Sequence, residues 1–483
     1  MRIARPVSIA LLAAIVPGAA SPQGTPRPAA AAANDAIRIP FETYKLANGL
    51  TVILSPDRSV PRATVDVWYH VGSKNEAPGK TGFAHLFEHV MFTGSGHAPY
   101  PLHDNLTGGV GGSNNGSTTE DRTNYYETIP SNYLESSLWL EADRMGFLLD
   151  KLDSAKFVAQ RDIVQNERRQ SVENQPYGRF FELLRVGLYP DSNPYSWPVV
   201  GYMSDLQRAG VEDVKSFFRL YYAPSNAYLA VTGDFETAQV KQWIAKYFGD
   251  LPRGAAIKRP AATPPRVTSE RRLVYEDRVQ IPRLYIAWPT VGVKHDDSRA
   301  LDVLTQVLTG SRTARLTKAL VYDAQSAASV QAFQNSSELL GEYALIVVPR
   351  PNNSLTSIET AIDSVLQRIK REGPTAAEME RALARAEFAF VSALETNFGK
   401  AETLLDGAVF HGDPGQYRTE HSRIKSVRAA DVKRVANTYL GAGRVVLSIV
   451  PTGKVDMAAR PELSKKVTVG ADGGHYTIEG RQP

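Results

Sequence analysis

The order of expected strands and helices occurs twice along this chain. In the first copy, a strand that ends at Val71-Gly72 leads to a helix that stops at Thr93-Gly94-Ser95. In the second, a strand that ends at Val291-Gly292 leads to a helix that stops at Thr309-Gly310-Ser311. A proline-rich stretch with little periodicity, 251–268, separates the copies. Duplication explains this better than chance similarity of two α/β units. We therefore expect an α+β fold of two homologous α/β domains, each with a mixed or antiparallel sheet packed with helices.

Local patterns mark the expected elements and boundaries. Asn48-Gly49 between two apolar runs is a strong hairpin signal, and 63–71 alternates apolar and polar residues as a strand does. We also expect strands at 227–232 and 444–450, and helices at 82–92, 132–149, 155–172, 237–247 and 376–394. The expected divisions are a signal peptide at 1–20, a Pro/Ala-rich linker at 21–37, an N-terminal domain at 38–250, an interdomain linker at 251–270, its homologue at 271–460 and a tail at 461–483.

The first twenty residues have the pattern of a secretory signal. Arg2 and Arg5 precede an apolar run at 7–16, and Pro17-Gly18-Ala19-Ala20 follows it with small residues. A buried helix is the alternative, which the extreme N-terminal position disfavours. The run is too short to span a bilayer, and no later run approaches the roughly 18 apolar residues that a spanning helix needs. We expect cleavage near Ala20, a periplasmic or secreted protein, and no membrane span.

The composition restricts both the partners and the metal chemistry of the chain. Lys and Arg number 55 against 51 Asp and Glu, a balance of +4 that gives no electrostatic footprint for nucleic acid. Hydrophobic residues make up 43% and charged residues 22%, as in a soluble globular protein. The chain has no cysteine, which excludes disulfides and thiolate ligands. Any transition metal must therefore be held by histidine and carboxylate side chains.

The segment His85-Leu86-Phe87-Glu88-His89 carries the strongest chemical signal. On a helix, His85 and His89 are one turn apart and share a face, so both imidazoles can bind one zinc ion. Glu88 lies beside them, where a carboxylate can take a proton from water and deliver it to a leaving amine. The order is H-x-x-E-H, the reverse of H-E-x-x-H. A solvated helix face with two histidines is the alternative, but the rest of this helix is apolar and unpaired polar groups are costly to bury.

A zinc site with two histidines needs a third protein ligand. On the expected helix at 155–172, Phe157, Val164 and Glu167 fall along one stripe, while Arg168 and Arg169 turn away. An acid that continues an apolar stripe should meet a cation or a metal. An ion pair with a neighbouring arginine is an equal alternative for Glu167. The rival acids for the third ligand are Glu127 and Glu173.

The second copy lacks the polar triplet. When the copies are aligned on Thr-Gly-Ser, His85, Glu88 and His89 fall opposite Leu301, Leu304 and Thr305. We therefore expect the second copy to keep the scaffold without metal ligands, which leaves one zinc ion per chain.

These motifs resemble those of the pitrilysin/insulinase family of zinc peptidases, the inverzincins, and in particular its short bacterial members, which are similar to mitochondrial processing peptidase subunits. The resemblance covers about 38–455 and rests on Asn48-Gly49, Val71-Gly72-Ser73, the segment 82–89, and Glu167, which lies 167 − 89 = 78 residues after His89. It implies that His85, His89 and Glu167 bind zinc and that Glu88 is the catalytic base. One departure is Gln160, where many relatives carry a second glutamate.

The resemblance also implies two substrate-binding residues. The segment 111–125 resembles the family's substrate-binding edge strand, to which an extended peptide adds by β-augmentation, with Asn115 donating to a peptide carbonyl. A Gly/Asn-rich surface loop is the alternative. The segment 309–316 resembles the one whose arginine binds substrate from the far wall of the chamber; Arg315 is the better match and Arg312 the alternative. A tyrosine that usually follows is missing from 325–329, and Tyr322 does not fit that register.

The resemblance implies a zinc-dependent endopeptidase that hydrolyses peptides or unfolded protein segments. In the family two such units face each other like a clam shell, so we expect a dimer, either of identical chains or with a homologous metal-free subunit. The missing tyrosine fits such a partner, and altered specificity is an equal alternative. The first alternative is a non-catalytic scaffold or peptide-binding subunit of the same fold, although such subunits usually lack a ligand or the base. The second is a zinc hydrolase that acts on a non-peptide bond.

Overall fold

A computed structural model describes residues 37–262, 264–265, 267–470 and 475–480. The signal peptide expected at 1–20 lies outside these residues, as does all but the last residue of the linker expected at 21–37. Residues Arg38–Pro483 form one compact unit, and the description concerns this unit. Across the described ranges, no helix combines the length and apolar character needed to cross a membrane.

Two sheets form the framework. The first has the strand order β1-β2-β6-β3-β5-β4 and the second β13-β12-β7-β11-β8-β10-β9. The strands of the first are β1 (Glu42–Lys45), β2 (Thr51–Pro56), β3 (Arg62–Tyr69), β4 (Ser113–Thr118), β5 (Thr123–Pro130) and β6 (Ala227–Gly233). The strands of the second are β7 (Arg271–Asp277), β8 (Arg283–Val291), β9 (Ala327–Ser336), β10 (Leu340–Pro349), β11 (Val445–Pro451), β12 (Lys465–Val469) and β13 (Tyr476–Ile478).

The same pairing pattern occurs in both sheets, which confirms the expected repeat. β2 runs parallel to β6, and β6, β3, β5 and β4 then pair antiparallel. In the second sheet β7 runs parallel to β11, and β11, β8, β10 and β9 pair antiparallel in the same order. The α+β fold with two mixed sheets is therefore confirmed. β12 and β13, in the expected tail at 461–483, extend the second sheet beside β7.

Helices cover both sheets. The first copy contains α1 (Phe83–Val90), α2 (Leu102–Thr107), α3 (Leu134–Phe147), α4 (Ser154–Arg168), α5 (Phe180–Leu188), α6 (Met203–Arg208), α7 (Val211–Tyr221) and α8 (Thr237–Phe248). The second contains α9 (Asp297–Thr309), α10 (Leu355–Glu372), α11 (Ala376–Ala393), α12 (Asn397–Asp406), α13 (Gln416–Ser426) and α14 (Ala429–Tyr439). The helix expected at 155–172 is α-helical only to Arg168, and a π-helical turn, Arg169–Glu173, continues it.

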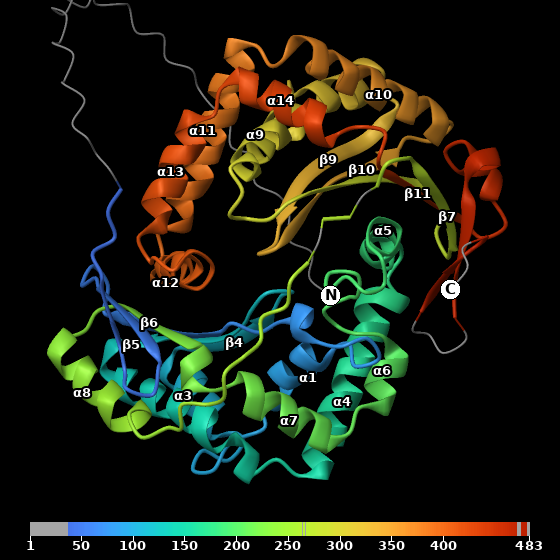
Figure 1. Cartoon of the computed structure of the whole chain (residues 1–483). Coiled ribbons are helices and arrows are strands. Elements are labelled where there is room, and N and C mark those ends of the chain that lie inside the picture. The colour runs from blue at the N-terminus through green and yellow to red at the C-terminus, as the bar shows by residue number, and fades with distance from the viewer. Residues whose placement is uncertain (1–36, 263, 266, 471–474, 481–483) are drawn as a thin grey trace, which may run out of the picture. The chain divides into compact units, whose positions relative to one another are not determined.

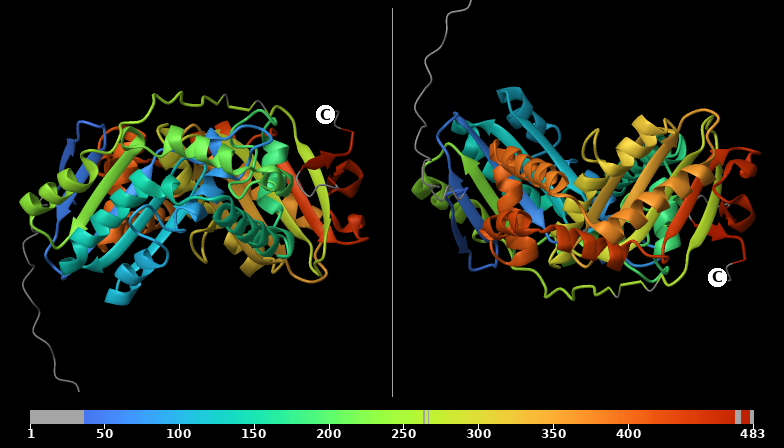
Figure 2. Two further views of the ribbon diagram at one scale, coloured as in Figure 1. Left: turned by 90° about the horizontal axis from the view of Figure 1, so that it is seen from below. Right: turned by 90° about the horizontal axis from the view of Figure 1, so that it is seen from above.

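Each copy contributes one helix that packs on the sheet of the other copy. α5 of the first copy packs on β8 and β11 of the second sheet, where its Leu183 and Leu184 join the core around Leu447. α12 of the second copy packs on β3 and β6 of the first sheet. Figure 1 shows α12 and α5 between the two sheets, and Figure 2 shows the yellow-green segment after α8 running along the outside from one sheet toward the other. Each sheet is therefore completed by a helix from the other copy.

A buried ionic network also joins the copies. Asp121, in the turn between β4 and β5, accepts hydrogen bonds from Nζ of Lys74 at 2.8 Å and the hydroxyl of Tyr195 at 2.7 Å. Its second oxygen accepts from the backbone N–H of Glu338 in the second copy, also at 2.8 Å. The carboxylate of Glu338 accepts in turn from Lys74 and from His70. The network is satisfied on both sides, as buried charges must be.

Glu338 is expected to contribute pH-dependent stability. Burial by itself would raise its pKa, but the hydrogen bond from His70 and the charge of Lys74 more than offset burial and lower the pKa from 4.5 to about 2. A lowered carboxyl pKa stabilises the fold fully above the unfolded value, and this stability is lost as pH falls toward the folded value. We expect Glu338→Gln to lower the free energy of unfolding at pH 7 by about 2 to 3 kcal/mol, allowing for partial solvent screening.

Urea unfolding of wild type and Glu338→Gln at several pH values would measure this contribution. The difference between the two proteins should be constant above about pH 5 and shrink as pH falls toward 2. Glu395→Gln, at an exposed position of the same copy, should change stability by no more than about 0.5 kcal/mol. A difference that does not depend on pH would contradict the assignment.

Candidate metal centre

The N-terminus of α1, the helix that carries His85 and His89, is held by a capping carboxylate. Glu76 caps the helix, because its carboxylate accepts from the backbone N–H groups of Gly82 at 2.9 Å and Ala84 at 2.8 Å. Gly82 has φ 85°, in the left-handed region, and a Cβ there would lie 2.8 Å from Cα of Gly201. Both the backbone angle and the close approach therefore require glycine. The apolar face of α1 is buried, with Phe87 against the rings of Phe218 and Tyr222, which leaves the other face for polar groups.

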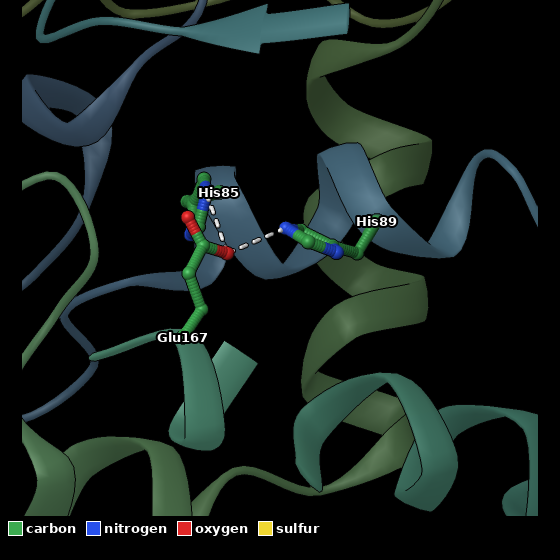
Figure 3. A group of neighbouring side chains, drawn as sticks. All are labelled: His85, His89 and Glu167. Atoms are coloured by element: carbon green, nitrogen blue, oxygen red, sulfur yellow. Dashed lines mark ion pairs between the residues drawn. The ribbon is translucent and has the colours of Figure 1, made fainter. Parts of the chain in front are cut away.

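His85, His89 and Glu167 converge on one point. Oε2 of Glu167, in the last turn of α4, lies 3.8 Å from Nε2 of His85 and 3.2 Å from Nε2 of His89. Figure 3 shows this oxygen facing both imidazole rings, with the histidines on α1 and Glu167 rising from the other helix. The residues are separated by 78 positions in sequence (167 − 89), and the packing of α4 against α1 brings them together.

The electrostatics of the three side chains suit a cation. Burial and the neighbouring His89 lower the pKa of His85 to about 4, so this imidazole is neutral at pH 7 and offers a lone pair. The hydrogen bond that its carboxylate accepts from His89 lowers the pKa of Glu167, which keeps this carboxylate charged. The site therefore presents two imidazole nitrogens and one anionic oxygen.

The donor set fits zinc. Four ligands at about 2.0–2.1 Å from a tetrahedral zinc ion lie about 3.3 Å apart, and the separations of 3.2 and 3.8 Å bracket this value. Two histidines and one carboxylate are also the ligands of several catalytic zinc sites, which keep the fourth position open. We conclude that these residues can hold zinc with small adjustments of side chains.

A second cluster, of His103, Glu127 and Glu141, has a similar composition but already contains a cation. Nη2 of Arg144 lies 2.8 Å from Oε1 of Glu141 and 2.9 Å from Nδ1 of His103. Its distance to Oε1 of Glu127 is 3.6 Å. The guanidinium occupies the place that an ion would take, so this cluster is a buried ion-pair network.

The rival acids for the third ligand are engaged elsewhere. Glu173 forms ion pairs with Arg168 at 3.4 Å and Arg179 at 3.6 Å, and Glu127 belongs to the cluster around Arg144.

The burial pattern of α4 differs in one respect from the stripe that the sequence predicts. Arg168, expected to turn away, is fully buried and forms a bidentate pair with Glu182 at 2.7 and 3.1 Å, whereas the Glu167 side chain is 45% exposed. The sequence pattern could not reveal Glu182, which anchors the end of α4 beside Glu167.

Glu88 lies on the same helix and faces the edge strand β4. Burial raises the pKa of Glu88, and its Oε2 accepts a hydrogen bond of 2.6 Å from the hydroxyl of Thr118. β4 ends the first sheet, and its outer edge pairs with no strand in the described part of the chain. A Cβ at Gly116 would lie only 3.2 Å from Cγ of Glu88, so glycine allows the strand to approach the acid.

The two expected substrate-binding residues have different surroundings. Asn115 is exposed on β4, where its Oδ1 accepts from the backbone N–H of Gly116 at 2.9 Å. The segment around Asn115 is therefore a strand and not a surface loop. Arg315 forms a bidentate pair with Glu378, with both contacts at 2.8 Å, and also donates to the carbonyl of Gly373. The side chain of Arg315 is therefore engaged within the second copy, and Arg312, the alternative, is exposed.

The equivalent helix of the second copy carries no ligands. α9 follows β8 as α1 follows β3, and Leu301 and Leu304 are fully buried in its core. The expected loss of the polar triplet in this copy therefore corresponds to apolar packing.

Comparison with known proteins gives two family matches. Residues 51–189 match the model described as "Insulinase (Peptidase family M16)", and residues 208–386 match "Peptidase M16 inactive domain". The first contains the candidate metal centre, and the second contains α9.

Individual relatives extend over most of the chain. Zinc protease PqqE of Helicobacter pylori is 32% identical over 409 residues, which cover 82% of this chain and 90% of the relative. Mitochondrial-processing peptidase subunit beta of Lentinula edodes is 24% identical over 414 residues, 83% of this chain and 88% of the relative. A crystal structure of a protease from Helicobacter pylori covers 85% of this chain and 99% of its own, with TM-score 0.80 and 28% identity. A peptidase M16 inactive domain from Pseudomonas fluorescens, 18% identical, covers 86% of this chain and 98% of its own with TM-score 0.76, and shows the fold alone.

Proposed function

Because this chain belongs to the insulinase family of peptidases, peptidase family M16, we propose that it is a zinc-dependent endopeptidase that hydrolyses peptides or unfolded protein segments. The observation that carries the proposal is the convergence of His85, His89 and Glu167, with separations of 3.2 and 3.8 Å, beside an acid and an open strand edge. A non-catalytic subunit would have no need of this complete set.

We assign one role to each part of the site. His85, His89 and Glu167 would hold zinc, which when bound supplies a Lewis acid that polarises a carbonyl and acidifies water. Glu88 takes the proton from the attacking water and returns it to the nitrogen of the departing amine. β4 holds the substrate as an added strand, since its free N–H and C=O groups can pair with an extended peptide. Asn115 is placed on this strand to contact the peptide.

Metal removal tests the proposal. The purified protein should cleave a quenched peptide library, lose turnover when a chelator removes zinc, and regain it when one zinc ion per chain is restored. Denatured and native forms of one substrate protein serve as the matched comparison, because an edge strand accepts only extended chain. Turnover that is unaffected by complete zinc removal would contradict the proposal.

We further propose that the chain acts as half of a dimer, with an identical or a homologous metal-free subunit. Two observations support this. Arg315 is held by Glu378 within its own copy, and two relatives are named as subunit beta, or probable subunit beta, of the mitochondrial processing peptidase. Assays of the chain alone and with any co-purifying homologue separate the two forms.

We also propose export to the periplasm or the medium, which the signal-like N-terminus supports.

A further inference from the structure

Thr118 connects the edge strand to the proposed base. It is the last residue of β4, and its Oγ1 donates a hydrogen bond of 2.6 Å to Oε2 of Glu88 on α1. In the proposed function these two elements have separate tasks, since α1 carries the base and β4 carries the substrate. The hydroxyl is therefore a direct link between the group that moves the proton and the strand that aligns the peptide.

Backbone packing brings the same two elements together at a second point. A Cβ at Gly116 would lie 3.2 Å from Cγ of Glu88 and 3.2 Å from Cε2 of Phe92. The aliphatic part of Glu88 thus lies against the backbone of β4, two residues before Thr118. Packing limits where the side chain can go, and the hydrogen bond fixes the rotation of its carboxylate.

The end of β4 that carries Thr118 is itself held firmly. In the turn that follows, the backbone N–H of Thr119 donates to the carbonyl of Arg122 at 2.9 Å, and the carbonyl of Thr119 accepts from the N–H of Ser73 at 3.2 Å. Asp121 in this turn belongs to the network with Lys74 and Glu338 that joins the copies. Thr118 therefore projects from a fixed support, as a group that orients another must.

From these contacts we infer that Thr118 is a positioning residue, whose hydroxyl holds the carboxylate of Glu88 in register with the peptide bound along β4. The inference rests on the proposed function. A hydrogen bond to one carboxylate oxygen fixes the plane of the group, so the other oxygen presents its lone pairs in a defined direction. Proton transfer depends steeply on such placement. The role is to orient Glu88 rather than to react.

Thr118→Val tests the inference, because it replaces the hydroxyl by a methyl group of similar size. We expect kcat for a quenched peptide to fall about 10- to 100-fold, as expected for loss of a hydrogen bond to a charged group, with KM changed by no more than about threefold. Thr118→Ser, which keeps a hydroxyl, should recover most of kcat. Zinc content and thermal midpoint should match the wild type in both variants.

Thr43→Val is the matched control. Thr43 lies in β1, the opposite edge strand of the same sheet, and its hydroxyl donates to the carbonyl of Val52 at 3.1 Å. This variant should leave kcat unchanged. An active wild type whose kcat survives Thr118→Val, or falls equally in Thr118→Ser, would overturn the inference and leave the proposed function intact. A correctly folded, zinc-loaded wild type without turnover would instead overturn the proposed function and this inference with it.

Discussion

Replacing Glu88 by glutamine is expected to lower kcat for peptide hydrolysis by about 10²- to 10⁴-fold while the protein still binds zinc. Glutamine has the size of glutamate and can still accept a hydrogen bond from the hydroxyl of Thr118, now 2.6 Å from the carboxylate. It cannot take a proton from water at neutral pH. The loss should therefore fall on kcat, and measurement of kcat, KM and zinc content on the same preparation would check it.

The control for this substitution is a second glutamate changed in the same way. Glu380 is exposed on α11, so Glu380→Gln should keep the wild-type kcat and zinc content. Equal turnover by wild type and Glu88→Gln would remove the proposed base. Loss of zinc together with turnover in Glu88→Gln would point instead to a disturbed metal centre.

Local spacing made two of the three proposed zinc ligands predictable. His85 and His89 are one helical turn apart, and the apolar residues around them predict a helix that the structure confirms as α1. The third ligand depends on packing between α1 and α4, which periodicity does not encode. The residues alone left Glu127, Glu167 and Glu173 as candidates. The structure separates them by their partners, since arginines contact Glu127 and Glu173, whereas Glu167 faces the imidazoles of His85 and His89.

Long-range contacts also limited what the sequence could say about the fold. Hairpin and strand signals such as Asn48-Gly49 are local, and β1 and β2 lie where these signals predict them. The exchange of α5 and α12 between the copies has no such signal, because an amphipathic helix does not specify which sheet it covers. β12 and β13 were missed for a related reason, since short strands at a sheet edge carry weak patterns. Thr118 lay within the expected edge strand, but only its contact with Glu88 distinguishes it from the neighbouring polar residues.

Replacing Glu167 by alanine is expected to weaken zinc binding by more than about 100-fold, and turnover should fall with it. The substitution removes the only charged donor from a set of three, and two imidazoles alone leave a catalytic zinc site incomplete. The Glu167 side chain is 45% exposed, so the loss of zinc should not come from unfolding. Competition with a chromophoric chelator would measure the affinity, and urea unfolding would check the fold.

Glu173→Ala provides the matched comparison, because Glu173 lies six residues further along the same segment (173 − 167 = 6) and pairs with Arg168 and Arg179 rather than with the histidines. If the geometry of the metal centre is as described, Glu173→Ala keeps its zinc affinity and Glu167→Ala does not. The opposite ranking would mean that the π-helical turn after α4 rearranges when zinc binds, and would move the third ligand to Glu173. Wild-type zinc affinity in both variants would show that neither carboxylate is the third ligand.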